Sequence, residues 1–142
     1  TADYYAGFIG NKLSIPAGEM FFRAILCNFF VCLAVACGMK CKNEVAKFFM
    51  IILCIAGFVV AGFEHCVANM FYIPAGILAS LNPAYVAKAE EAYGITAEQI
   101  ATLTPLHSLA NFIPVTLGNM LGGMIFVGLP LYLIYKKNWE NK

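Results

Sequence analysis

The sequence predicts an all-α integral membrane protein, and three observations support that fold class. Apolar side chains make up 61% of the 142 residues and charged ones 12%, whereas soluble domains average roughly 45–50% and about 25%. The charges are also unevenly placed, because none falls within residues 24–39 or 99–135, and Glu64 is the only one within residues 48–87. Finally, three apolar stretches are long enough to cross a bilayer, which excludes an ordinary cytosolic protein.

Two of these stretches have the length of a single crossing, for which about 20 apolar residues are needed. The first covers about residues 17–38 and the last about residues 108–135. The last helix is expected to begin at about Pro105 or Phe112. Thr104-Pro105 resembles a helix N-cap followed by proline at the first helical position, and with that start Pro114 would kink or restart the helix. Gly118 and Gly122 within it form a GxxxG step, which predicts close packing against another helix.

The middle stretch, residues 46–80, is too long for one straight span. Its 35 residues would extend roughly 52 Å as a helix, against a hydrocarbon core of about 30 Å. Gly62-Phe63-Glu64-His65 interrupts the apolar run, and we expect a break near residues 62–69. The stretch forms either a hairpin of two short helices or one crossing made of two half-helices joined by a non-helical loop.

Charge in the connecting segments favours the single broken crossing. Residues 38–47 and residues 135–142 each carry three lysines against one glutamate, whereas residues 80–104 carry one lysine against three glutamates. The positive-inside rule places both basic segments in the cytoplasm, which one crossing allows and a hairpin does not. The chain is therefore predicted to be multi-pass, with three spans and a cytoplasmic C-terminus.

A broken helix at membrane depth favours transport. Non-helical backbone is tolerated there only where protein buries it or where it lines a water-filled cavity. Discontinuous helices recur in transport proteins built from inverted repeats, and three spans with a broken middle helix correspond to one such repeat. The chain holds no internal duplication, so we expect the partner three-helix half to lie N-terminal to Thr1.

Glu64 and His65 are the only acidic, basic or histidine residues within residues 48–87. An ionisable residue within the membrane is a functional hypothesis by default. His65 is the better candidate, because histidine ordinarily titrates near pH 6.5, close to neutrality. A structural histidine bonded to a neighbouring helix is the alternative. For Glu64 a structural role is favoured, since a fixed anion would repel an anionic substrate.

Other polar and bulky residues of the spans have two interpretations each. The amides of Asn28, Asn69 and Asn119 either bond across helices or line a polar path. Phe58, seven residues before His65, is either an apolar constriction or a packing residue. Lys12 is either a cation that enriches anions near a pore mouth or a solvated lysine at the membrane interface.

The remaining features exclude several classes of protein. The six cysteines show neither a CxxC pair nor a Cys/His set at zinc spacing, so they are interpreted as reduced packing residues, and neither a metal nor another cofactor is expected. A net charge of +1 gives no basic excess for nucleic acid. No catalytic motif of a soluble enzyme is present, so we predict that the protein is not an enzyme.

Three segments carry a specific resemblance. The first is similar to a signature segment of the formate/nitrite transporter family: Ala24-Ile25-Leu26-Cys27-Asn28-Phe29-Phe30-Val31-Cys32-Leu33-Ala34. Gly62-Phe63-Glu64-His65-Cys66-Val67-Ala68-Asn69-Met70-Phe71 resembles the central histidine segment of that family. Ile113-Pro114-Val115-Thr116-Leu117-Gly118-Asn119 resembles its last helix. The three occur in the family's order and cover nearly the whole chain.

The resemblance implies an aquaporin-like inverted-repeat channel fold, with residues 1–142 as the fourth to sixth transmembrane helices of a six-helix protomer. It also implies a homopentamer in the bilayer of the bacterial cytoplasmic (inner) membrane. The implied function is a channel or transporter for small monovalent anions of weak acids, namely formate, nitrite or hydrosulfide. Among these members, the cysteine-rich composition favours the hydrosulfide channels.

Residue roles follow from the same resemblance. His65 corresponds to the pore histidine, which assists passage by hydrogen bonding or transient protonation, and Asn119 to its hydrogen-bonding neighbour. Cys66 departs from the serine that many members carry, so a hydroxyl contact is not expected there. The predicted pore or substrate-binding residues are His65, Asn119, Phe58, Lys12, Val67 and Asn69.

The alternative function is a haem-carrying or structural membrane anchor subunit of a respiratory complex, since the chain has three spans and two histidines. Two axial haem ligands must meet at one depth. His65 falls in the middle of the membrane and His107 near the outer end of the last span, so transport is favoured.

Overall fold

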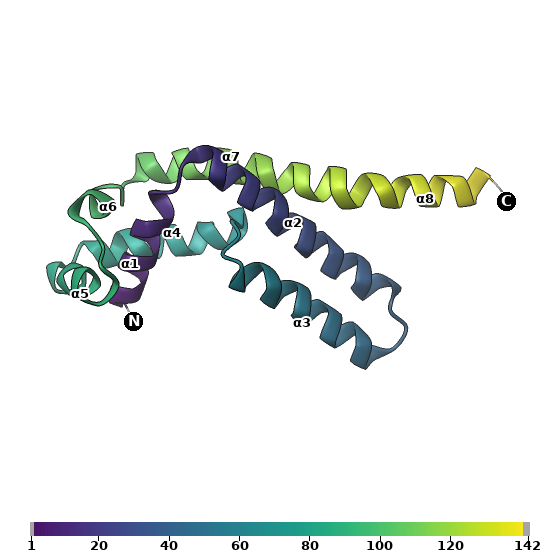
Figure 1. Cartoon of the computed structure of the whole chain (residues 1–142), viewed down its shortest axis with the longest axis horizontal. Helices are drawn as coiled ribbons and strands as arrows, with labels where there is room; N and C mark the ends of the chain where they lie inside the picture. Colours follow the sequence, from purple (N-terminus) through teal and green to yellow (C-terminus); the bar gives the residue numbers. More distant parts are fainter. Residues whose placement is uncertain (1, 141–142) are drawn as a thin grey trace. The chain divides into compact units, whose positions relative to one another are not determined.

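The computed structural model describes residues 2–140, and its elements in that range are all helices (Figure 1). The first four are α1 (Ala2–Leu13), α2 (Ala17–Lys40), α3 (Glu44–Val60) and α4 (Cys66–Ser80). Then follow α5 (Pro83–Tyr93), α6 (Ala97–Ala101), α7 (Pro105–Gly123), a π-helical segment η1 (Met124–Gly128) and α8 (Leu129–Glu140). The predicted all-α fold class is confirmed.

The helices form two compact units. The first unit comprises Thr1–Glu19 and Cys66–Pro114, and the second comprises Met20–His65 and Val115–Lys142. The chain passes from the second unit to the first directly after His65. Helices α2 and α7 each contribute residues to both units.

In the first unit, α1 packs against α4, α5 and α6. One buried cluster joins Ile9 and Leu13 of α1 to Ile73 of α4 and to Leu103, in the connection between α6 and α7. Gly76 makes this contact possible, because a Cβ on it would lie 2.6 Å from the Cβ of Ile9. The helix α1 therefore lies directly on the backbone of α4.

Turn chemistry fixes the helix ends in this unit. Asn82 caps α5, which then begins with Pro83, and Gly94 ends α5 with a φ of 63°. Thr96 and Gln99 form a capping box at the start of α6. The Thr104 hydroxyl accepts the backbone N–H of His107 at 3.3 Å, so α7 has the predicted N-cap with Pro105 at its first position.

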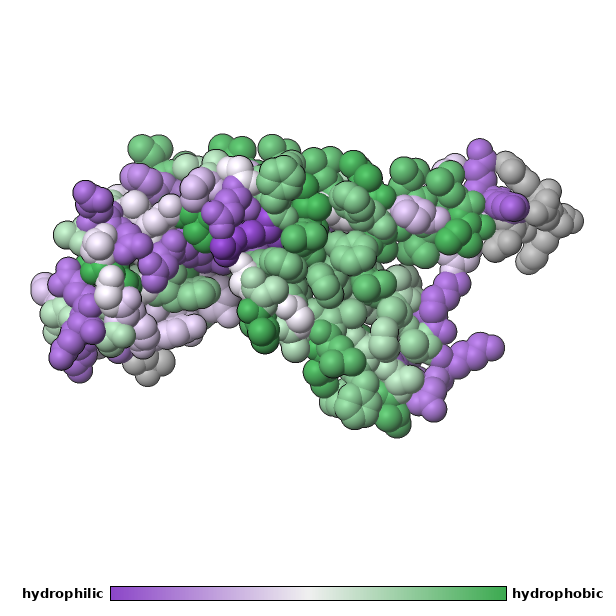
Figure 2. Space-filling model, in the orientation of Figure 1, coloured by the Kyte–Doolittle hydropathy of each residue, from purple (hydrophilic) through white to green (hydrophobic). Residues whose placement is uncertain are grey.

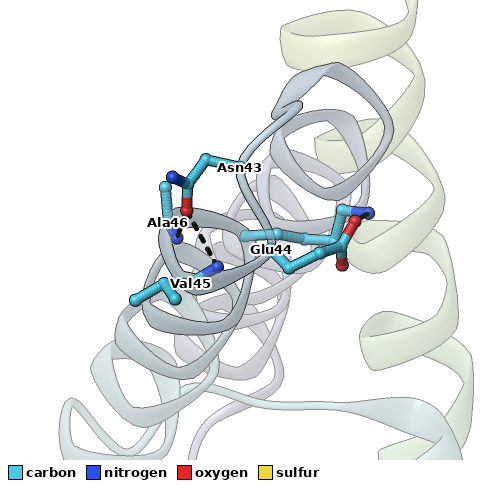
Figure 3. A network of polar contacts seen from close by, with 5 residues as sticks. Asn43, Glu44, Val45 and Ala46 are labelled. Atoms are coloured by element: carbon cyan, nitrogen blue, oxygen red, sulfur yellow. Dashed lines mark hydrogen bonds and ion pairs between the residues drawn. The ribbon is translucent and has the colours of Figure 1, made fainter.

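In the second unit, α2 and α3 form an antiparallel hairpin (Figure 1). The Oδ1 of Asn43 caps α3 by accepting the backbone N–H groups of Val45 and Ala46 at 2.9 and 3.1 Å (Figure 3). Helix α7 packs on α2 through glycine, since a Cβ on Gly122 would overlap the carbonyl oxygen of Ile25. The close packing predicted from the GxxxG step is confirmed.

The lengths of the helices bear on membrane crossing. Among the described residues, Ala17–Lys40 and Pro105–Lys137 are each long and apolar enough to cross a membrane. The pair Cys66–Ser80 and Pro83–Tyr93, bent by 110°, would count as a third span if taken together. Helices α3 and α4 have 17 and 15 residues, so neither spans a bilayer easily by itself.

The break in the middle stretch is shorter than the sequence predicted. The non-helical residues are 61–65, whereas Cys66–Asn69, which were expected to fall in the break, form the first turn of α4. The physical reason lies in residue type. Gly62 adopts a φ of 67°, which favours glycine, and nothing after His65 opposes the helical conformation.

Candidate pore site at the helix break

The candidate site is the segment Ala61–His65, where the chain leaves α3 and has not yet entered α4. Its first residues continue to use carbonyls of α3: the backbone N–H of Gly62 donates to Val59 at 3.1 Å, and that of Phe63 donates to Phe58 at 3.1 Å. These contacts tighten the end of α3. The positive φ of Gly62 then redirects the backbone towards His65.

Asn119 of α7 holds this segment in place. Its Nδ2 donates to the carbonyl oxygen of Glu64 at 2.9 Å and to the carbonyl oxygen of Ala24 in α2 at 2.8 Å. Asn119 is 4% exposed and Glu64 is 1% exposed, so these bonds are buried. A side-chain amide has two donor protons, and both are directed to backbone carbonyls. The carboxamide orientation is thereby fixed, with Oδ1 as its only acceptor.

A second amide extends the network. Nδ2 of Asn28, in α2, donates to the backbone carbonyl oxygen of Asn119 at 2.6 Å. Together, the two asparagines connect α2, α7 and the break through three bonds, each from a side-chain amide to a main-chain carbonyl. Of the two interpretations of Asn28 and Asn119, these contacts correspond to bonding across helices.

A cation of α2 also contacts the break. Nη1 of Arg23 donates to the carbonyl oxygen of Gly62 at 3.3 Å. This arginine was not among the predicted site residues, although a cation in an apolar helix is unusual enough to indicate a role. Its contact places a guanidinium group next to the residue with the left-handed backbone.

Two pairs of rings lie at the same segment. The rings of Phe58 and His65 have centroids 5.7 Å apart, and those of Phe30 and Phe63 are 6.1 Å apart. Phe58 is buried and His65 half-buried. Three predicted site residues, Phe58, His65 and Asn119, therefore lie around one break in the second unit.

The other three predicted site residues belong to the first unit. Nζ of Lys12 lies 5.4 Å from the ring centroid of Phe8, one turn earlier in α1. Nδ2 of Asn69, in α4, donates to Oδ1 of Asn111, in α7, at 2.9 Å. Val67 is 62% exposed on α4. The partner of Asn69 was missed from the sequence, because nothing in the local pattern of Asn111 distinguishes it from other polar residues of its helix.

The cysteines are free thiols in the structure. Within residues 2–140, no group of three or more histidine, cysteine, aspartate or glutamate side chains is arranged to hold a metal ion. The groups at the described site are the imidazole of His65, the carboxyl group of Glu64, the guanidinium group of Arg23, side-chain amides and backbone carbonyls beside aromatic rings.

A family model and several known relatives point to the same protein family. The family model described as "Formate/nitrite transporter" matches residues 2–133. The formate channel FocA of Haemophilus influenzae is 43% identical over 114 residues, which cover 78% of this chain and 39% of the relative. FocA of Escherichia coli is 40% identical over 118 residues, covering 82% and 41%. The uncharacterized transporter YwcJ of Bacillus subtilis is 36% identical over 124 residues, covering 87% and 41%.

Solved structures agree with the sequence matches. A pentameric formate channel with formate bound superposes with a TM-score of 0.74 at 35% identity, covering 94% of this chain and 51% of that one. An ion channel of the FNT family superposes with a TM-score of 0.63 at 30% identity, covering 92% and 45%. The chain thus spans about two fifths of the length of these curated relatives and about half of the structures it matches.

Proposed function

Because the chain belongs to the formate/nitrite transporter family, we propose that it is the second half of a membrane channel for small monovalent anions of weak acids. The relatives that it resembles are named as channels and transporters, not as enzymes or as anchors of respiratory complexes. This supports transport over a haem-carrying or structural anchor. The observation that carries the proposal is the break at Ala61–His65, where the buried Glu64 is bonded through its carbonyl to Asn119 and the ring of Phe58 lies beside His65.

In this proposal α3 and α4 together make one broken membrane crossing between the spans of α2 and of α7–α8. Both half-helices are shorter than the 20 or so residues that a crossing usually needs, whereas the two in sequence exceed that length. The non-helical backbone at 61–65 then lies within the protein, as the bilayer requires. Helix α4 begins directly after His65, so the positive end of its dipole lies at the histidine and favours an anion there.

In this proposal the positive charge of Lys12 attracts the anion towards the pore mouth, and the anion then meets an apolar constriction near Phe58. A bare ion pays a large desolvation cost in such surroundings. His65 reduces that cost in one of two ways. It donates an N–H to the anion, or it transfers a proton to it, so that the neutral acid passes and the imidazole takes a proton again from the far side. Val67 and Asn69 are further pore positions on α4.

Asn119 acts in this scheme as a positioning residue. Its two amide protons are held by the carbonyls of Ala24 and Glu64, so it offers a neighbour an acceptor and no donor. An acceptor suits the N–H of an imidazole and not an anion. We therefore assign Asn119 to the orientation of His65, with the anion contacted by the histidine.

The complete protein in this proposal has an N-terminal three-helix half related to this chain by an inverted repeat, and five copies assemble in the bacterial inner membrane with their C-termini in the cytoplasm. The chain covers 51% of a channel chain of this fold, which supports a further half, and the description of that channel as pentameric supports the pentamer. The basic residues at both inner segments support the orientation. Lys142, one of those residues, lies outside the described residues.

The anion itself is proposed as formate, nitrite or hydrosulfide. The test is flux through the full-length protein reconstituted in liposomes, with each of the three anions and with gluconate as a bulky control. We expect flux of at least one small anion well above that of protein-free liposomes, and none for gluconate. Absence of small-anion flux from correctly inserted protein would contradict the proposal.

A further inference from the structure

A cluster of lysines lies at one end of the second unit. Lys40 ends α2, Lys42 follows in the connection to α3, and Lys136 and Lys137 belong to the last turns of α8. All four side chains are exposed. Nζ of Lys40 lies 4.3 Å from the ring centroid of Tyr135, so the end of α2 is directly beside the last turns of α8. These four residues are called the lysine cluster below.

The backbone that carries the cluster is well fixed. Asn43 caps α3 with two hydrogen bonds immediately after Lys42 (Figure 3). Lys47 is not counted in the cluster, because its side chain is only partly exposed and its Nζ forms an ion pair with Oε1 of Glu44 at 2.9 Å. Gly38 lies close to Ile51, since a Cβ on it would be 3.3 Å from the Cδ1 of that side chain. The α2–α3 connection is thus fixed by the cap at the start of α3 and by the packing of Gly38 in α2 against Ile51 in α3.

Apolar surface adjoins the cluster. The helices that carry it expose large hydrophobic side chains within one or two turns of the lysines: Val35, Met39, Tyr132, Leu133 and Ile134. Figure 2 shows this end of the second unit as hydrophilic groups bordering an apolar surface along the helices. A partner that matches both features has an anionic group joined to hydrocarbon.

We propose that the lysine cluster binds the phosphate of an anionic phospholipid, whose acyl chains lie along the exposed apolar faces of α2 and α8. Lysines at a helix end attract anionic headgroups electrostatically, and Tyr135 is of the residue type that favours the membrane–water interface. An acidic soluble protein would contact the lysines alone and leave the apolar helix faces unmatched. The inference concerns lipid binding and is independent of which anion the protein transports.

The test compares two lipids on the full-length protein purified in a neutral detergent. Native mass spectrometry measures how much phosphatidylglycerol and how much phosphatidylcholine remain bound at equal concentration. Each lysine near an anionic surface contributes about fivefold to binding. We expect the wild type to prefer phosphatidylglycerol, and the combined variant Lys40→Gln, Lys42→Gln, Lys136→Gln and Lys137→Gln to lose at least about tenfold of that preference.

Matched variants separate charge from folding. Lys88→Gln, at an exposed position of α5, should keep the full preference, and replacement of all four lysines by arginine should retain most of it. If the glutamine variant does not fold, the arginine variant and a rise in salt concentration still apply, because salt weakens a charge-based preference. A preference lost upon adding inorganic phosphate at constant ionic strength, and kept with chloride in its place, would assign the site to free anions. That result would overturn the proposal, and so would equal binding of both lipids by the wild type. The proposal would also be overturned if the four lysines were needed for binding soluble polyglutamate but not for binding phosphatidylglycerol.

Discussion

Replacing Asn119 by leucine tests the network that holds the break. The variant keeps a similar side-chain volume and removes both donors, leaving the carbonyls of Ala24 and Glu64 without the bonds they now receive at 2.8 and 2.9 Å. Asn28→Leu is the matched comparison, because it removes one bond of the same kind, to the carbonyl of Asn119. The two variants therefore differ in the number of interhelical bonds lost.

The magnitude follows from the count of bonds. Interhelical hydrogen bonds in membrane proteins average about 0.6 kcal/mol and reach about 1.7 kcal/mol. Asn119→Leu should lower the free energy of unfolding by roughly 1–3 kcal/mol, and Asn28→Leu by about half as much. The cost lies towards the upper end if the two carbonyls stay dry, since a buried unsatisfied group costs about 1–3 kcal/mol.

The assay is unfolding of the full-length protein by sodium dodecyl sulfate in mixed micelles, followed by circular dichroism. We expect the order wild type, Asn28→Leu, Asn119→Leu in decreasing stability. Asn119→Leu should also impair anion flux more strongly than Asn28→Leu, because it alone releases the carbonyl next to His65. A stability of Asn119→Leu equal to that of the wild type would refute the assignment of these bonds.

Three further variants probe packing, capping and the constriction. Gly122→Ala should lower the free energy of unfolding by about 2 kcal/mol or more, because the new Cβ would overlap the carbonyl of Ile25. Gly57→Ala should be tolerated, because a Cβ there has its nearest neighbour at 3.7 Å. Unfolding in mixed micelles distinguishes the two variants. Asn43→Ala should cost about 1 kcal/mol through loss of the cap and Asn43→Asp should not, by the same measurement. Phe58→Ala should admit larger anions such as acetate in liposome flux; unchanged size selectivity would exclude Phe58 as the constriction.

Much of the fold could be predicted because it depends on local pattern. Uncharged runs of sufficient length identified the spans of α2 and α7–α8, and Thr104-Pro105 identified the start of α7. Gly62 marked the break, since its backbone conformation favours glycine. The break was expected near residues 62–69 and lies at residues 61–65, so the polar Asn69 belongs to α4. Within α4 that polarity is met by Asn111.

The site was less predictable, because its contacts join residues far apart in the chain. The type and position of Asn119 indicated either packing or a polar path, and only the structure shows its donors on the carbonyls of Ala24 and Glu64. The same holds for Arg23, whose bond to Gly62 spans 39 positions. Periodicity predicts which face of a helix is buried, but it does not predict which backbone group a side-chain amide or guanidinium group reaches.

The pH dependence of anion flux tests the role of His65 most directly. Full-length wild type, His65→Gln and His107→Gln are reconstituted in liposomes, and formate flux is measured between pH 5 and 8, the range in which histidine changes its charge. His107→Gln is the matched control, at an exposed position at the start of α7. We expect His65→Gln to lose the pH dependence and about tenfold or more of the flux, equivalent to about 1.4 kcal/mol of barrier, while His107→Gln follows the wild type. An unchanged profile in His65→Gln would contradict the central proposal.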